Sequence, residues 1–290
     1  MLRRASLWGI FWFFLHLIFC QFGDCGMKYL GNQLNPVQII FLRFFFATVW
    51  LLPVVRRKKR ELRTSRPGVH FSRSCILCMA MLLWCLGLQR AALPMASIIE
   101  FSNPLILLFL ASFFLGERIT KSKLIVTLVG FLGIVIVAEP TMGSFNTAII
   151  PLFFSVVLFV GADIINKKFA TEEPMLATLF YTALGITLVT CIPAALLWRP
   201  MTFKLWIAVA AIGASADLLF FCIICSFRLI EASTTAPWRY LEFGLSVASG
   251  YFLFGETPSV STLLGAAVII PTTLLLACDE LRIGQKCCRG

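Results

Sequence analysis

Charged residues are scarce in this chain of 290 residues: they make up 13% of the sequence, against roughly 25% in soluble domains. Histidine is scarcer, with two residues, and there is no HExxH sequence that could hold a catalytic zinc. The chain also lacks the GxxxxGKS or GxxxxGKT loop that cradles nucleotide phosphates. No Ser, His and Asp set is placed for nucleophilic catalysis. These absences argue against an enzyme and against a transporter driven by ATP.

Apolar residues, in contrast, make up 59% of the sequence and gather in long runs. A soluble protein of this size has too little interior to bury so much apolar surface, so we expect lipid around it. In lipid the backbone must satisfy its own hydrogen bonds, which leaves helices or a closed β-barrel. The runs lack the two-residue alternation of barrel strands. The sequence therefore predicts an all-α integral membrane protein.

The eleven cysteines are an odd number and lie mostly within the apolar runs, which argues against a disulfide framework. Two CxxC spacings occur, Cys75/Cys78 and Cys222/Cys225, but both lie in apolar segments, where cysteine usually acts as a small apolar residue. We expect neither a bound metal nor a cofactor.

Ten apolar segments are candidates to cross a hydrocarbon core of about 30 Å, which takes ~20 residues of helix. Clusters of Pro, Gly, Asn or charged residues separate them, as helix ends require. The ten predicted transmembrane helices are Leu7–Tyr29, Val37–Val55, Ser74–Ala91, Met95–Leu115, Leu124–Val137, Ile149–Asn166, Leu176–Leu197, Leu205–Phe227, Ser233–Phe254 and Thr262–Ala277.

Lysine and arginine are distributed unevenly between the ends of these spans, which predicts an orientation because basic loops stay in the cytoplasm. With both termini cytoplasmic, nineteen of the 25 basic residues fall inside the cell, many of them between Arg56 and Arg73, and three fall outside. Lys28, Arg43 and Arg239 lie within spans. This distribution accounts for the net charge of +11 without a nucleic-acid partner.

The two halves of the chain repeat each other at an offset of 139 residues. Because five spans is an odd number, the second copy lies upside down relative to the first. We therefore expect two inverted five-helix repeats, 1–140 and 141–280, and a cytoplasmic tail at 281–290. Such repeats are common in secondary carriers, whose solute site lies at the repeat interface. The matched residues are Asp24/Asp163, Lys28/Lys167, Gly116/Gly255 and Glu117/Glu256.

This five-plus-five plan, with Gly–Glu ending the fourth span of each half, resembles the drug/metabolite transporter superfamily of the EamA type. Several blocks are also similar to the S-adenosylmethionine uptake transporters of obligate intracellular bacteria. The resemblance implies import of S-adenosylmethionine across a bacterial inner membrane, in exchange for S-adenosylhomocysteine, by alternating access. The blocks are FLRFFFA (41–47), TSRPGVH (64–70), ADIINKKF (162–169), ASTTAPWRYLE (232–242) and VIIPTTL (268–274).

Arg239 and Glu242 are the first candidates for the solute site, because a charge inside a span costs ~2.5–3.5 kcal/mol and usually faces a cavity or a partner. They lie three residues apart on one helix face, next to Pro237, which breaks the backbone ladder. For the implied solute, Arg239 would hold the carboxylate and Glu242 the ammonium or sulfonium. Trp238 or Tyr240 would stack on adenine or meet the sulfonium. The alternative is an ion pair that only fixes packing.

Arg43, Glu100 and Phe101 complete the predicted solute site. Arg43 lies in the second span, and its counterpart at the 139-residue offset is the uncharged Thr182, so symmetry does not explain it. Its alternative role is snorkelling towards lipid headgroups. Glu100, next to Phe101, is a candidate to meet the positive centre of the solute or a coupling proton. Its alternative is pairing with Arg43 or Lys28.

Charged pairs near the two mouths are the predicted gating or coupling residues. Asp24/Lys28 and Asp163/Lys167 have the i, i+4 spacing of an intrahelical salt bridge, and the inversion places one pair at each mouth. They are either gates that close in turn or solvated helix ends. Asp217, about halfway along the eighth span, either works with them or is buried with a partner.

Two other charged features are expected to be structural. Glu117 and Glu256 end their helices, where a negative charge opposes the helix dipole, so another contact must hold them. The basic segment from Arg56 to Arg73 is expected chiefly to set the orientation.

A carrier of the same superfamily for amino acids or other metabolites is the main alternative function. A channel would need a continuous pore and rings of one charge sign, which the sequence does not show. The expected partners are therefore a small-molecule solute and the lipid bilayer, with no prediction of oligomeric state.

Overall fold

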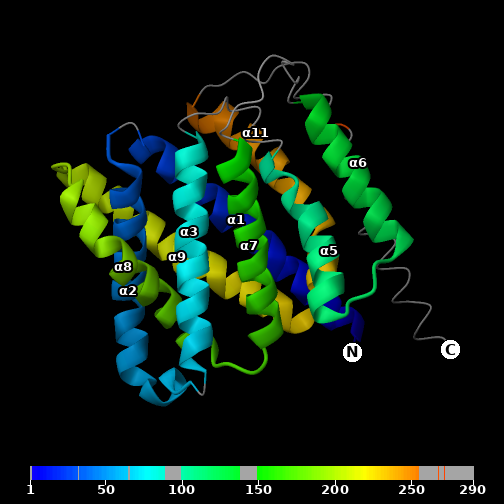
Figure 1. Cartoon of the computed structure of the whole chain (residues 1–290), viewed down its shortest axis with the longest axis horizontal. Helices are drawn as coiled ribbons and strands as arrows, with labels where there is room; N and C mark the ends of the chain where they lie inside the picture. Colours follow the sequence, from blue (N-terminus) through cyan, green and yellow to red (C-terminus); the bar gives the residue numbers. More distant parts are fainter. Residues whose placement is uncertain are drawn as a thin grey trace.

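A computed structural model of the protein describes residues 2–31, 33–64, 66–88, 99–137, 149–254, 267 and 271. Every regular element within these ranges is helical, as the sequence predicts (Figure 1). The long helices are α1 (Leu2–Gly31), α2 (Pro36–Arg57), α3 (Pro67–Leu88), α5 (Asn103–Leu115), α6 (Lys121–Val137), α7 (Ile149–Phe169), α8 (Met175–Leu196), α9 (Phe203–Leu229) and α11 (Leu241–Phe254). The short elements are η1 (Lys59–Leu62), α10 (Ala232–Thr235) and η2 (Pro237–Tyr240).

Five of the described helices are long and apolar enough to cross a membrane: the segment Ser6–Gly31 of α1, and α2, α7, α8 and α9. They confirm a multi-pass, all-helical membrane protein. The predicted count of ten stays a prediction, because the tenth span, Thr262–Ala277, lies outside the described residues apart from two positions. The tail at 281–290 lies outside them as well.

Local sequence signals set several helix ends. Asn35 caps α2, its side-chain oxygen accepting a hydrogen bond from the backbone N–H of Val37 at 3.0 Å, and Pro36 occupies the first turn, where no N–H is needed. At the other end of a helix, Gly116 stops α5 with a left-handed conformation (φ 68°) that glycine adopts without steric cost. The chain can therefore turn sharply before Glu117.

Two predicted spans are interrupted in the structure. The fourth was expected to be continuous from Met95, but a turn at 101–102 precedes α5, and the segment 89–98 lies outside the described residues. The ninth is divided into α10, η2 and α11, with the break at Pro237. Proline lacks the N–H that a continuous helix needs at that point, so the chain shifts into a tighter turn. Both interruptions lie next to predicted solute-site residues.

Helix packing occurs in pairs related by the 139-residue offset. The offset carries the bounds of α2 onto those of α8, and these two helices pack against each other. Shifting residue numbers by the same offset relates the α1–α9 contact to the α7–α3 contact. It likewise relates the α5–α7 contact to the α11–α1 contact. The structure contains all four contacts. Each half therefore packs its first helix against the third helix of the other half.

Large apolar side chains cover the outside of this bundle. Phe113, Leu196, Phe203 and Phe252 are each about four-fifths exposed, which is costly in water but favourable against lipid tails. The connections α2–α3, α5–α6, α7–α8 and α9–α10 all lie at one end, the lower edge of Figure 1, together with the start of α1. This end carries most of the basic loop residues, and we call it the basic end.

Candidate functional site

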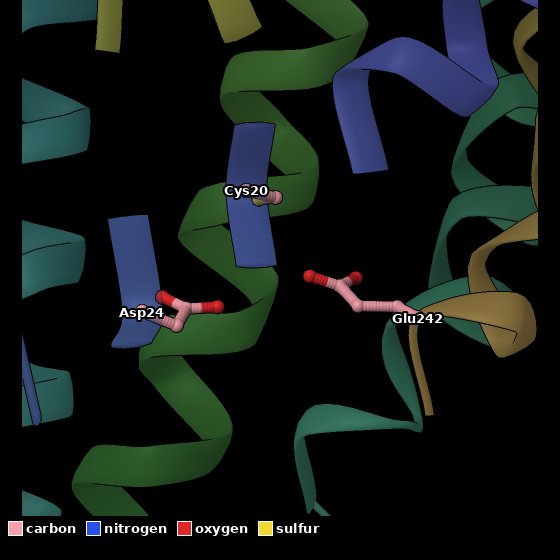
Figure 2. Close-up of side chains that lie close together, drawn as sticks. All are labelled: Cys20, Asp24 and Glu242. Carbon is pink, nitrogen blue, oxygen red and sulfur yellow. The ribbon is translucent and has the colours of Figure 1, made fainter. Parts of the chain in front are cut away.

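The centre of the candidate site is formed by α1 and the first turn of α11. Cys20 and Asp24 lie one turn apart on α1, and Glu242 points towards them across a gap (Figure 2). Their ligand atoms all lie within 4.8 Å of one another. Glu242 follows the break at Pro237, and the free N–H groups of a helix start favour a negative charge there.

Glu100 adds a third carboxylate to this group, which we call the acidic cluster: Asp24, Glu100 and Glu242. Its neighbour Phe101 packs against Tyr240 and Phe243, on either side of Glu242, with ring centres 6.4 and 6.0 Å apart. The side chains of Asp24 and Glu100 have exposed surface although both belong to the helical bundle. Among residues whose side chains are described, no ion pair involves any of the three. The cluster is therefore a set of three carboxylates without a basic partner among the described side chains.

Arg43 of α2 lies beside the acidic cluster and is 6% exposed. Its guanidinium rests against Gly23, where an added Cβ would be 2.9 Å from Nη2, and its Nη1 donates a hydrogen bond to Met27 Sδ at 3.3 Å. Its Nε has no hydrogen-bond partner among the described residues, and Asp24 directly follows Gly23 in the chain. Arg43 thus turns inward to α1 rather than snorkelling outward.

Arg239, in η2, forms an ion pair with Asp163 of α7, and its guanidinium lies 6.0 Å from the centre of the Phe13 ring. The predicted bridge within α7 between Asp163 and Lys167 is wrong. Lys167 Nζ instead donates hydrogen bonds to the carbonyl oxygens of Phe227, at 2.6 Å, and Ile230, at the end of α9. The end of a helix offers free carbonyl oxygens and a partial negative charge. Lys167 binds these carbonyls instead of the Asp163 carboxylate one turn away. The side chain of Lys28, the counterpart of Lys167, lies outside the described residues.

Further contacts tie the basic end together. Glu117, just after α5, accepts hydrogen bonds from the backbone N–H groups of Ala232 and Ser233 at 2.9 and 2.7 Å, and so caps α10. Lys123 Nζ lies 2.8 Å from Glu231 and 2.9 Å from the Ser233 hydroxyl. Glu117 is unfavourable at the end of α5, because its charge opposes that helix dipole. Its contact with the start of α10 compensates, since a helix start favours a negative charge. Its counterpart Glu256 lies outside the described residues.

Arg73 was grouped with the basic segment that sets orientation, and this assignment needs correction. Arg73 lies within α3 and is 3% exposed, since that helix begins at Pro67, seven residues before the predicted span. Its guanidinium donates hydrogen bonds to Asn166 Oδ1 at 3.1 Å and to the carbonyl oxygen of Thr178 at 2.6 Å. Arg73 therefore joins α3 to α7 and α8.

A buried acid next to Arg73 was also missed from the sequence. Glu173 is 4% exposed and accepts a hydrogen bond from the Thr64 hydroxyl at 2.7 Å, while His70 Nε2 lies 3.3 Å from the same carboxylate oxygen. Thr64 and His70 belong to the TSRPGVH block. The polar residues of this block, next to the start of a helix, were the sequence signal for a buried partner. Their hydrogen bonds with Glu173 explain why they are polar.

The aromatic candidates occupy different environments. Tyr240 is fully buried, and its hydroxyl donates a hydrogen bond to the Thr127 carbonyl at 3.0 Å. Trp238 is also buried and packs in the apolar core. Phe101 is only partly buried and stacks on Tyr240 at 6.4 Å between ring centres. Of the three, Phe101 directly follows Glu100 of the acidic cluster, and it also packs against Phe243, the residue after Glu242.

Asp217 lies on α9 and is partly buried, and its Oδ2 has no hydrogen-bond partner in the part of the chain that the structure describes. It does not belong to the acidic cluster, and its predicted part in coupling stays a prediction. The thiol and two carboxylates of Cys20, Asp24 and Glu242 are spaced so that they could hold a cation. The prediction that no metal is bound also stays a prediction.

Comparison with known proteins places the chain among transporters and not among enzymes. It is 41% identical over 279 residues to the S-adenosylmethionine uptake transporter of Rickettsia conorii, covering 96% of this chain and 95% of that one. The corresponding transporter of Rickettsia bellii is 42% identical, with 96% of each chain covered. The riboflavin transporter of Brucella anthropi is 26% identical, covering 83% of this chain and 87% of that protein.

The same fold occurs in a crystal structure of another protein, with a TM-score of 0.79 and 17% sequence identity, over 96% of this chain and 98% of that chain. Residues 7–138 match the EamA-like transporter family directly. With the long, highly similar relatives, this match shows that the chain belongs to the EamA-like transporter family.

Proposed function

We propose that the protein imports S-adenosylmethionine across a bacterial inner membrane in exchange for S-adenosylhomocysteine, by alternating access between two inverted repeats, 1–140 and 141–280. Relatives that are 41% and 42% identical over nearly the whole chain carry S-adenosylmethionine. The structural observation that supports the proposal most is that the acidic cluster and the inward-turned Arg43 lie side by side.

The chemistry of this arrangement matches the groups of S-adenosylmethionine. That solute carries two positive groups, a sulfonium and an ammonium, and one carboxylate. Arg43 would hold the carboxylate, because its buried Nε still lacks a partner and a guanidinium can form paired hydrogen bonds with a carboxylate. The acidic cluster would hold the positive groups, and Phe101 would offer its ring to adenine. Arg239 is assigned to gating, since Asp163 already neutralises it.

The contacts at the basic end support an outward-facing state. The ion pair of Arg239, the Lys167 contact with the end of α9 and the Glu117 cap together join α7, α9, α10 and α5. With the basic end in the cytoplasm, these contacts would close the inner mouth. In the opposite half, the side chains of Asp24 and Glu100 have exposed surface. Solute would enter there, and the inner contacts would then break.

Counterflow tests the proposal directly. Proteoliposomes containing the whole chain are loaded with unlabelled S-adenosylhomocysteine and diluted into labelled S-adenosylmethionine. We expect label to accumulate inside faster than in liposomes loaded with buffer alone. Accumulation that does not depend on internal S-adenosylhomocysteine would overturn exchange. Failure to take up S-adenosylmethionine, with uptake of riboflavin or an amino acid instead, would favour another carrier of the family.

A further inference from the structure

Exposed basic side chains crowd the end of α2 and the connection that follows it. The one acid within this stretch, Glu61, pairs with Lys58 at 2.8 Å. Among the side chains that the structure describes, no acid pairs with any of the others. The stretch therefore presents a dense positive charge, and we call its basic residues the basic patch. They are Arg56, Arg57, Lys58, Lys59, Arg60 and Arg63, and all six are exposed.

The basic patch continues the face of α2 that is suited to lipid. Trp50 and Val54 are 54% and 42% exposed, and large exposed apolar side chains are favourable against lipid tails. Arg57 lies on the same face, because positions i, i+4 and i+7 of a helix share one side. α2 ends at Arg57, directly after this apolar stripe. The charge therefore begins where the apolar stripe ends, at the depth of the lipid headgroups.

The connection after α2 is held against the rest of the protein. Leu62, at the end of η1, packs against the buried apolar core, and its carbonyl oxygen accepts a hydrogen bond from the Tyr181 hydroxyl of α8 at 3.1 Å. Thr64 follows and binds the buried carboxylate of Glu173 at 2.7 Å. Since the backbone of the patch is already ordered, a partner that binds it does not have to offset the entropy of ordering that backbone.

We propose that the basic patch is a binding surface for the anionic headgroups of phospholipids in the leaflet at the basic end. Clusters of about four to eight Lys and Arg next to a transmembrane helix attract such headgroups. The guanidinium groups of the patch can also form paired hydrogen bonds with a phosphate. Bound lipid would hold the end of α2 and, through the hydrogen bond between Leu62 and Tyr181, α8 as well. The patch thus gains a role beyond orientation, and this role does not depend on which solute the protein carries.

The position of the patch favours lipid over other polyanions. A nucleic acid or an acidic protein would have to displace headgroups that already surround the end of α2. The stretch from Arg56 to Arg63 also contains no aromatic residue on which a base could stack. Its charge and its depth in the membrane both fit a phospholipid.

The first test compares an anionic with a zwitterionic lipid. The whole chain, purified in an uncharged detergent, is titrated with phosphatidylglycerol or with phosphatidylcholine, and bound lipid is measured by native mass spectrometry. We expect Arg57→Gln with Arg60→Gln to weaken phosphatidylglycerol binding by about 25-fold, about fivefold for each charge, and to leave phosphatidylcholine binding unchanged.

The matched control removes two exposed basic residues at the α5–α6 connection of the same end, Arg118→Gln with Lys121→Gln. It should keep nearly all of the phosphatidylglycerol binding. Equal losses of binding in the two double variants would mean that net charge alone attracts the lipid, and would overturn the proposal. Equal binding of the two lipids by the unmodified protein would overturn it as well.

The second test asks whether bound lipid stabilises the fold. Phosphatidylglycerol should raise the thermal unfolding temperature more than phosphatidylcholine does, because a ligand of the folded state stabilises it. The rise should shrink in Arg57→Gln with Arg60→Gln, and also as salt is added, since salt screens exposed charges. A rise of the same size in this double variant would overturn the proposal. So would loss of binding to a short single-stranded oligonucleotide while phosphatidylglycerol binding is unchanged, since the patch would then fit nucleic acid.

Discussion

Arg239 and Asp163, which are 76 residues apart, form an ion pair that ties η2 to α7 at the boundary between the acidic cluster and the basic end. Because both side chains are largely buried, each depends on the other to offset its loss of water. Breaking the pair would therefore release η2 from α7 and leave two buried charges without partners.

Arg239→Ala should lose nearly all uptake. Removing one partner of a buried ion pair costs ~3–5 kcal/mol, which would destabilise the closed inner mouth. The measurement is initial uptake of labelled S-adenosylmethionine, normalised to the amount of protein in the membrane. The exchanged pair, Asp163→Arg with Arg239→Asp, should recover part of the rate. Normal uptake by Arg239→Ala would remove the residue from the gate.

Gly23→Ala should weaken solute binding without unfolding the protein. The new Cβ would lie 2.9 Å from Arg43 Nη2, and a flexible side chain can move aside. We expect the KM for S-adenosylmethionine to rise roughly tenfold, as when a charge-assisted hydrogen bond weakens by ~1.5 kcal/mol. Gly161→Ala is the matched control, because no atom lies within 4 Å of its added Cβ. Equal KM values in Gly23→Ala and Gly161→Ala would show that Arg43 does not bind the solute.

Glu117→Gln should lower the thermal unfolding temperature of the purified protein in detergent. The change removes the negative charge from a carboxylate that accepts two backbone hydrogen bonds, and bonds to charged groups contribute ~1.5–3 kcal/mol. Glu61→Gln is the control, because the Glu61 pair with Lys58 is about half exposed and such pairs contribute ~1 kcal/mol or less. A larger effect of Glu61→Gln would contradict the capping role.

Arg73→Ala should destabilise the protein far more than Arg66→Ala, although both residues belong to the same basic segment. Arg73 is buried and its loss leaves the Asn166 and Thr178 acceptors without their donor, whereas the Arg66 pair with Glu172 is about half exposed. Expected costs are ~3 kcal/mol or more for Arg73 and ~1 kcal/mol or less for Arg66. Unfolding of both variants in detergent measures the difference. Equal losses of unfolding free energy in the two variants would mean that Arg73 serves only to set the orientation in the membrane.

The positions of the helices were predictable, because a segment that crosses lipid must be apolar and long enough to span it. The expected second and seventh spans differ from α2 and α8 by one or two residues at each end. The break near Pro237 was also predictable, since proline removes a backbone donor wherever it stands. The start of α3 was not, because the apolar run begins only at Ser74, while polar residues before it satisfy each other inside the protein.

The partners of the charged residues could not be predicted, because helical spacing reveals only neighbours within one helix. It assigned Lys167 to Asp163, whereas the true partner of Asp163 comes from η2. It also grouped Arg239 with Glu242 on one face, although the helix break turns them towards different neighbours, Asp163 and Asp24. The roles of the acidic cluster, of Asp217 and of Arg43 in transport stay predictions.

The crossed packing of α1 on α9 and of α3 on α7 has a consequence for the ancestry of the chain. A single five-helix unit would leave uncovered the faces that the other unit now buries. If the halves arose by duplication, as the proposed repeats imply, the ancestral polypeptide must have worked as a pair of identical subunits inserted in opposite directions. Fusion would then have freed each copy to diverge, and Glu100 now stands in one half where Arg239 stands in the other.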